Sequence, residues 1–186
     1  MMFSRANIFT LPNILTLIRA LIAPFVAIGI ATEHFVQALA LLVVGGLTDI
    51  FDGWLARLTK RDNQLGAYLD PIADKLLILA CYAGLPFVGL MPFWLSFLII
   101  GRDVLIVGGF ALLQILQAPI RVLPTKISKI TTVFQIATAF YLLLPMAVTL
   151  SPIPQLVHAL FITTVLLTIA SAVVYIMIGW RAFSNR

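Results

Sequence analysis

Residues 49–74 read DIFDGWLARLTKRDNQLGAYLDPIAD, and four of the five aspartates in this stretch stand among apolar residues. They are Asp49, Asp52, Asp70 and Asp74. The first two share a helical face that Gly53 and Ala56 continue at i+4 and i+7. The last two share a face with Gly66, at spacings of four residues. A short polar turn separates the two sets, so the sequence predicts two antiparallel helices whose acidic faces meet.

The depth of these aspartates indicates a function. A charged group at the centre of a spanning helix costs roughly 2.5–3.5 kcal/mol, so four of them require partners. At 1.5 Å per residue, Asp52 lies about 12 Å from Lys60 and Asp74 about 12 Å from Gly66, which places both sets in the same half of the membrane. Oxygen ligands without histidine or thiol favour Mg²⁺ or Mn²⁺. We therefore predict that the four carboxylates bind two divalent ions that share ligands.

The composition places the chain in the membrane class. Of the 186 residues, 62% are hydrophobic and only 10% are charged, against about 25% charged in ordinary soluble domains. The formal net charge is +5. Because the basic residues punctuate apolar runs, they indicate membrane topology and phosphate binding, and no nucleic-acid partner is expected. The single cysteine, Cys81, is expected to be a small buried apolar residue.

Six apolar stretches are long enough to span a bilayer, which needs roughly 20 residues. They cover about residues 14–32, 36–59, 67–88, 93–116, 129–150 and 154–178. The prediction is an all-α, polytopic membrane protein with six transmembrane helices in a single domain over residues 1–186. Residues 1–13 are either an amphipathic segment lying along the interface or a frayed terminus.

Lysine and arginine set the predicted orientation, because cytoplasmic loops carry an excess of them. They are absent from the first, third and fifth loops. They occur in the terminal segments and in or beside the second and fourth loops, at Arg5, Arg57, Lys60, Arg61, Arg121, Lys126, Lys129, Arg181 and Arg186. With an even number of spans, both termini and the acidic site then face the cytoplasm from the inner (cytoplasmic) membrane.

The spacing of the whole motif resembles that of a known family. Asp49-x-x-Asp52-Gly53-x-x-Ala56-Arg57, eight further residues, and Gly66-x-x-x-Asp70-x-x-x-Asp74 match all eight positions that define the CDP-alcohol phosphatidyltransferase (class I) family. The resemblance implies a six-span enzyme whose aspartates hold two divalent cations against the diphosphate of a CDP-alcohol. It further implies that Asp74 is the general base, that Gly53, Ala56 and Gly66 border the cytidine, that Arg57 lies near the diphosphate, and that the protein is a homodimer.

The start of the first span carries the expected donor contacts. Residues 12–19 resemble the Pro-Asn-x-x-Thr-x-x-Arg entry of family members that make phospholipids, which suggests that Asn13 and Thr16 contact the nucleotide side of a lipid donor, CDP-diacylglycerol. The alternative interpretation is a helix start at Pro12 with Arg19 snorkelling to the interface.

A basic pocket is expected for the acceptor. Arg102 lies within the fourth predicted span beside Asp103, and Lys126 and Lys129 open the fifth. We interpret Arg102, Lys126 and Lys129 as ligands of an acceptor phosphate. The alternatives are that Arg102 and Asp103 only neutralise each other and that the lysines only reflect the positive-inside bias.

Two branches of the family fit this pocket. The general pattern resembles phosphatidylglycerophosphate synthase, whose acceptor is glycerol 3-phosphate. The Gly-Arg-Asp and Pro-Thr-x-x-Ser-Lys elements look closer to CMP-forming cardiolipin synthase, whose acceptor is phosphatidylglycerol. Inositol phosphate or serine is an alternative acceptor. A cation-coupled transporter is a remote alternative, since such proteins place their sites near the midplane on broken helices, often in repeated halves.

Overall fold

The fold is a bundle of helices, seen here in a computed structural model that describes residues 11–59, 75–115 and 125–184. Within these ranges the side chains of residues 11–15, 49–59, 110–115, 182 and 183 are not described. The elements are α1 (Leu11–Ala31), α2 (Phe35–Thr59), a helical segment (Lys75–Gly84), α4 (Phe93–Ile115), α5 (Lys126–Ala147) and α6 (Pro154–Ser184). No strand occurs in the described ranges, so the predicted all-α class is confirmed.

Three predicted stretches, 14–32, 36–59 and 93–116, agree with α1, α2 and α4 to within three residues at each end. The predicted bounds of the other stretches were less accurate. The helical segment ends at Gly84 instead of 88, because Pro86 disfavours helical backbone in the residue before it. α5 runs over Lys126–Ala147 instead of 129–150. α6 continues to Ser184 instead of 178, because a helix can extend past the apolar stretch from which its end was predicted.

The start of α5 is fixed by a polar cap. Thr125 has extended backbone angles, φ −73° and ψ 153°, and its hydroxyl accepts a hydrogen bond from the backbone N–H of Ser128. This bond, 3.2 Å long, satisfies one of the N–H groups that a helix leaves unpaired at its N-terminus. The cap therefore sets the positions of Lys126 and Lys129 in the first turn of the helix.

α1 and α2 form an antiparallel hairpin. Glu33 turns the chain with φ +62°, and the N–H of His34 donates to the carbonyl of Gly29 at 2.8 Å. A Cβ on Gly29 would lie 3.3 Å from the Cβ of Ala38, so the two backbones approach closely where both side chains are small.

Lys75–Gly84 lies at the centre of the bundle. Leu77 packs against Gly45 of α2, and Gly84 against Ile30 of α1. The hydroxyl of Tyr82 donates to the backbone carbonyl of Gln135 in α5 at 2.9 Å. Cys81 is buried and is not in a disulfide, as expected. Contacts from several helices thus fix the segment that follows Asp74 in the sequence.

Several polar side chains are buried in this bundle beside its apolar core, and many large apolar side chains face outward. Thr131, Gln135, Thr138, Thr164 and Ser171 are fully buried. The outward-facing apolar side chains include Phe97, Val133 and Leu166, each more than 60% exposed. Apolar surface on this scale indicates contact with lipid. By length and composition, Lys126–Ala147 and Pro154–Arg181 are able to cross a membrane, which together with the outer surface indicates a membrane-associated protein.

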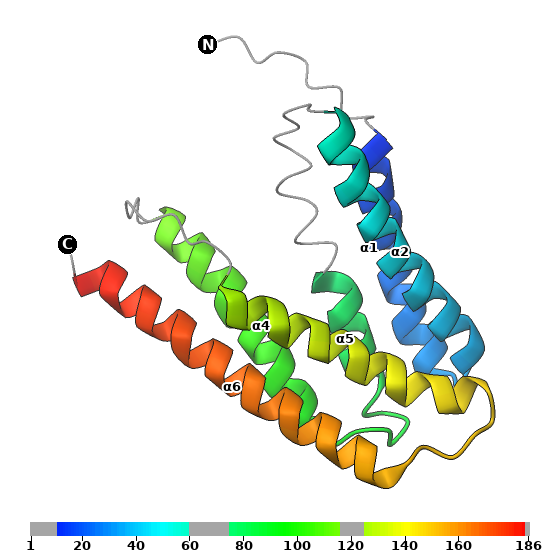
Figure 1. Cartoon of the computed structure of the whole chain (residues 1–186). Helices are drawn as coiled ribbons and strands as arrows, with labels where there is room; N and C mark the ends of the chain where they lie inside the picture. The colour runs from blue at the N-terminus through cyan, green and yellow to red at the C-terminus, as the bar shows by residue number, and fades with distance from the viewer. Residues whose placement is uncertain (1–10, 60–74, 116–124, 185–186) are drawn as a thin grey trace.

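The chain passes back and forth through the bundle. α5 and α6 run antiparallel along one side, and α1 and α2 along another (Figure 1). The starts of α1 and α5 and the ends of α2, α4 and α6 consequently lie toward one end of the bundle (Figure 1).

The close contact at Gly84 yields a prediction. A Cβ at this position would lie 3.0 Å from the Cβ of Ile30 and 3.2 Å from the carbonyl oxygen of Ala27, whereas one at Gly109 in α4 would meet nothing within 4 Å. Overpacking costs about 1–3 kcal/mol, and alanine gains up to about 1 kcal/mol of helix propensity over glycine. Gly84→Ala should lower the Tm in detergent by a few degrees, and Gly109→Ala should leave it unchanged or raised. Equal Tm values for the two variants would contradict this packing.

Candidate active site

The first half of the aspartate motif lies in the last turns of α2. This helix continues to Thr59, so the helical spacing predicted for its motif residues is confirmed for the backbone of Asp49, Asp52, Gly53, Ala56 and Arg57. Their side chains, and all of Gly66, Asp70 and Asp74, lie outside the described part of the chain. The meeting of the two acidic faces therefore stays a prediction. Among the described side chains, no group of three or more histidine, cysteine, aspartate or glutamate residues could hold a metal ion.

The predicted donor residues lie at the start of α1, where Asn13 occupies the first turn. Thr16 is 2% exposed and Arg19 is fully buried. A snorkelling arginine would hold its guanidinium in water, so the snorkelling interpretation of Arg19 is wrong. The contact of Asn13 and Thr16 with a nucleotide stays a prediction.

The buried side chain of Arg102 in α4 contacts two other helices, α5 and α6. Its Nε and one terminal nitrogen donate to the hydroxyl of Ser171 in α6 at 3.1 and 2.6 Å. The same terminal nitrogen donates to the hydroxyl of Ser128 in α5 at 2.7 Å. The other terminal nitrogen binds the carboxylate of Asp103. The side chain is 1% exposed, and these contacts hold its charge in an apolar bundle.

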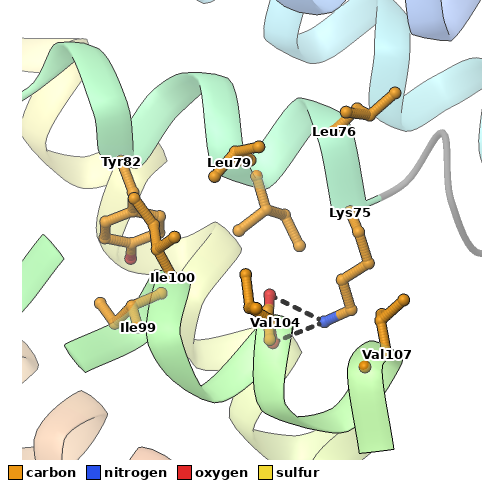
Figure 2. A pocket seen from close by; sticks show the side chains of 11 residues that line it. Lys75, Leu76, Leu79, Tyr82, Ile99, Ile100, Val104 and Val107 are labelled. Atoms are coloured by element: carbon orange, nitrogen blue, oxygen red, sulfur yellow. Dashed lines mark hydrogen bonds and ion pairs between the residues drawn. The ribbon is translucent and has the colours of Figure 1, made fainter. Parts of the chain in front are cut away.

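The Asp103 carboxylate binds a second cation, Lys75. The Lys75 ammonium lies 3.0 and 3.1 Å from the two carboxylate oxygens and 3.5 Å from the hydroxyl of Thr132 in α5. Figure 2 shows the Lys75 side chain extending from the helical segment toward α4. Two cations and one carboxylate leave this cluster with one net positive charge.

An apolar pocket adjoins this ion pair, with a volume of about 350 Å³. It lies between Lys75–Gly84 and α4, and Leu79, Ile100 and Val104 line it (Figure 2). Lys75 and Asp103 supply its charged groups. The pocket can thus accept apolar groups beside a charged end.

The predicted acceptor residues are only partly brought together. Arg102 contacts the first turn of α5 through Ser128, which stands between Lys126 and Lys129. Both lysines are exposed, whereas Arg102 is buried and hydrogen-bonded. The structure thus gives Arg102 the role of holding the turn that carries the lysines, and its direct contact with an acceptor stays a prediction.

The sequence prediction missed Lys75 and the two serines. A lysine within the predicted span 67–88 was a usable signal, because ionisable residues inside spans are expected to have a partner or a function. Ser128 and Ser171 offered no comparable signal. Serine is common in apolar helices, and Ser171 lies 69 residues from Arg102 along the chain.

Residues 9–179 match the CDP-alcohol phosphatidyltransferase family, whose members generally use divalent metal ions. The chain belongs to this family.

Curated relatives carry the names of two activities. A Drosophila melanogaster protein named probable cardiolipin synthase (CMP-forming) is 35% identical over 72% of this chain and 47% of its own length. A Mycobacterium tuberculosis protein named probable phosphatidylglycerophosphate synthase is 32% identical over 92% and 82%. A Cereibacter sphaeroides CDP-diacylglycerol–glycerol-3-phosphate 3-phosphatidyltransferase is 38% identical over 73% and 64%. The chain spans about half the length of the animal cardiolipin synthases that it matches.

Proposed function

We propose that this protein transfers a phosphatidyl group from CDP-diacylglycerol to a glycerol-phosphate-type acceptor and releases CMP. The acceptor is glycerol 3-phosphate, giving phosphatidylglycerophosphate, or phosphatidylglycerol, giving cardiolipin. The family match over residues 9–179 carries the proposal, and the names of relatives at 32–38% identity support it. The surplus positive charge beside α5 also suits acceptors that contain phosphate.

Two divalent cations, Mg²⁺ or Mn²⁺, fit the residues of the motif. The proposed ligands Asp49, Asp52, Asp70 and Asp74 offer only carboxylate oxygens, which hard cations prefer. Asp49 and Asp52 lie within one turn of α2, a backbone spacing that suits a shared site. When bound, such ions supply charge stabilisation for a diphosphate and for CMP as it leaves.

The remaining chemistry falls to the chain's own residues. Asn13, Thr16, Gly53, Ala56, Arg57 and Gly66 form the proposed binding site for the nucleotide side of the donor. Asp74 accepts the proton of the acceptor hydroxyl. At the same time the hydroxyl oxygen forms a bond to the phosphorus of the phosphatidyl group. The bond from that phosphorus to the CMP oxygen breaks, and CMP leaves with the electron pair.

Lys126 and Lys129 are the proposed contacts for the acceptor phosphate, with Arg102 completing the basic pocket. Both lysines are exposed in the first turn of α5, and the Thr125 cap and the Arg102–Ser128 bond fix that turn. A turn held from two sides presents its cations with little loss of conformational freedom on binding.

We further propose a single domain with six spans in the inner membrane, both termini and the active site at the cytoplasmic face, and a homodimeric assembly. The lengths of the described helices support the spans, since α1, α2, α4, α5 and α6 each contain at least 21 residues. The start of α5 and the end of α6 lie toward the same end of the bundle as the end of α2 (Figure 1). Lys126 begins α5 and Arg181 stands in the last turn of α6, which suits one basic, cytoplasmic side.

One assay tests the proposed activity. Purified protein receives CDP-diacylglycerol, Mg²⁺ or Mn²⁺, and one acceptor at a time from glycerol 3-phosphate, phosphatidylglycerol, inositol phosphate and serine. We expect CMP release with one of the first two acceptors and identification of the matching lipid product by mass spectrometry. Folded, monodisperse protein that releases CMP with none of the four would defeat the proposal.

The role of Asp74 is tested by Asp74→Asn. The variant keeps the size of the side chain and loses the base, so CMP release should fall by about 10²–10⁴-fold. Mn²⁺ binding, followed by electron paramagnetic resonance, should be largely retained through the other three aspartates. Glu33→Gln in the exposed turn between α1 and α2 is the matched control. Turnover near that of the wild type in Asp74→Asn would remove its role as base.

The acceptor contacts are tested by Lys126→Met and Lys129→Met. Each variant removes an exposed cation and keeps an unbranched side chain, so the KM for the acceptor should rise about 10-fold, the loss of roughly 1.4 kcal/mol of binding. The KM for CDP-diacylglycerol should stay within about twofold. Arg181→Met, at the end of α6, is the control. Equal rises in both KM values would contradict the assignment.

A further inference from the structure

The Asp103 carboxylate connects cations from two parts of the bundle. Both of its oxygens accept from Lys75 in the helical segment, at 3.0 and 3.1 Å, and Oδ1 also accepts from the neighbouring Arg102. The side chains of Lys75, Asp103 and Arg102 are 26%, 14% and 1% exposed. These low exposures remove most of the competition from water, so the contacts are stronger and more specific in geometry than a surface ion pair.

The network continues into the two remaining neighbours of α4. Arg102 donates to Ser128 in α5 and to Ser171 in α6. Lys75 lies 3.5 Å from the hydroxyl of Thr132, one turn further along α5 than Ser128. One chain of polar contacts therefore joins the helical segment to α4, α5 and α6 at the level of Lys75.

The positions of these residues in the sequence connect the network to the proposed chemistry. Lys75 directly follows Asp74, the proposed base. Ser128 stands between Lys126 and Lys129, the proposed acceptor contacts. Consecutive Cα atoms are held about 3.8 Å apart by the peptide bond, so an anchor on Lys75 restricts where Asp74 can lie.

We infer that Lys75 and Asp103 are positioning residues for phosphatidyl transfer. The Lys75–Asp103–Arg102 chain fixes Lys75, the residue after the base, relative to the turn of α5 that carries the acceptor lysines. The proposed base is thereby held in a constant position relative to the bound acceptor. This inference rests on the proposed function. Neither side chain needs to touch a substrate, and both act through Asp74 and the first turn of α5.

A purely structural ion pair would behave differently. Losing such a pair lowers the amount and the thermal stability of folded protein and leaves kcat per folded molecule unchanged. A positioning pair changes kcat per folded molecule, because small displacements of reacting groups can cost about 100-fold in rate. The donor KM separates either case from a binding role, since the described contacts of Lys75, Asp103 and Arg102 reach α4, α5 and α6 and not the proposed donor residues of α1.

The test uses Lys75→Met, Lys75→Arg, Asp103→Asn and the double variant Lys75→Met/Asp103→Asn in the full-length protein. CMP release gives kcat and both KM values per folded molecule, and thermal unfolding in detergent gives the Tm. We expect Lys75→Met and Asp103→Asn to lower kcat about 10- to 100-fold, with the donor KM within about twofold of wild type. Lys75→Arg should restore most of kcat, because its guanidinium can also pair with Asp103. Arg181→Met and Glu33→Gln are the controls.

The double variant shows whether the two residues act together. If Lys75 acts through Asp103, the double variant loses no more activity than the worse single variant. Three results would overturn the inference and leave the proposed function standing. The first is a double variant in which the losses of the single variants multiply, and the second is a kcat above half that of wild type in Lys75→Met. The third is a loss of activity that the loss of folded protein explains in full. Wild-type protein that releases no CMP would instead overturn the proposed function, and the inference with it.

Discussion

The charge of Arg102 must find partners inside an apolar bundle, and the arrangement of α4, α5 and α6 depends on the hydrogen bonds and the ion pair that supply them. An unpaired charge at this depth would be strongly unfavourable. The guanidinium instead finds Asp103 on its own helix and one serine hydroxyl on each of the two neighbouring helices. Because its donors are fixed in a plane, these partners restrict how α5 and α6 can rotate about their axes. The Thr125 cap also fixes the first turn of α5, through a hydrogen bond within that turn.

The two halves of the bundle are held together by different kinds of contact. Gly29 against Ala38 and Gly84 against Ile30 allow backbones to approach closely in the half of the bundle formed by α1, α2 and Lys75–Gly84. In the other half, hydroxyl groups connect the helices, as where Thr138 and Thr164 lie 2.9 Å apart. Because the surroundings of the helices are equally apolar, the hydrophobic effect adds little to their association, and close packing and hydrogen bonds contribute most. Lys75 joins the two halves, since it belongs to the central segment and pairs with Asp103 of α4.

The sequence was sufficient for the helices but not for the contacts between them. Hydropathy and turn residues predicted the helical regions, because each depends on residues that are neighbours in the chain. Helix ends were less accurate where a cap or a proline decides them, as at Thr125 and Pro86. The partners of Arg102 could not be predicted, since a hydrogen bond to a serine 69 residues away depends on the rotation of α6. The meeting of the aspartate faces is still a prediction, because their side chains lie outside the described residues.

Under the proposed function, a phosphate common to both acceptors lets the same cations of this chain suit either of the two activities that its relatives are named for. Relatives named for cardiolipin synthesis and for phosphatidylglycerophosphate synthesis match this chain at 35% and 32% identity. Under the proposed function, glycerol 3-phosphate and phosphatidylglycerol each bring a phosphate and a glycerol hydroxyl to the same base. The proposed acceptor contacts, the cations in the first turn of α5, would recognise the phosphate, whichever alcohol carries it. Selection between the two acceptors must therefore come from contacts with the part that differs, the presence or absence of acyl chains.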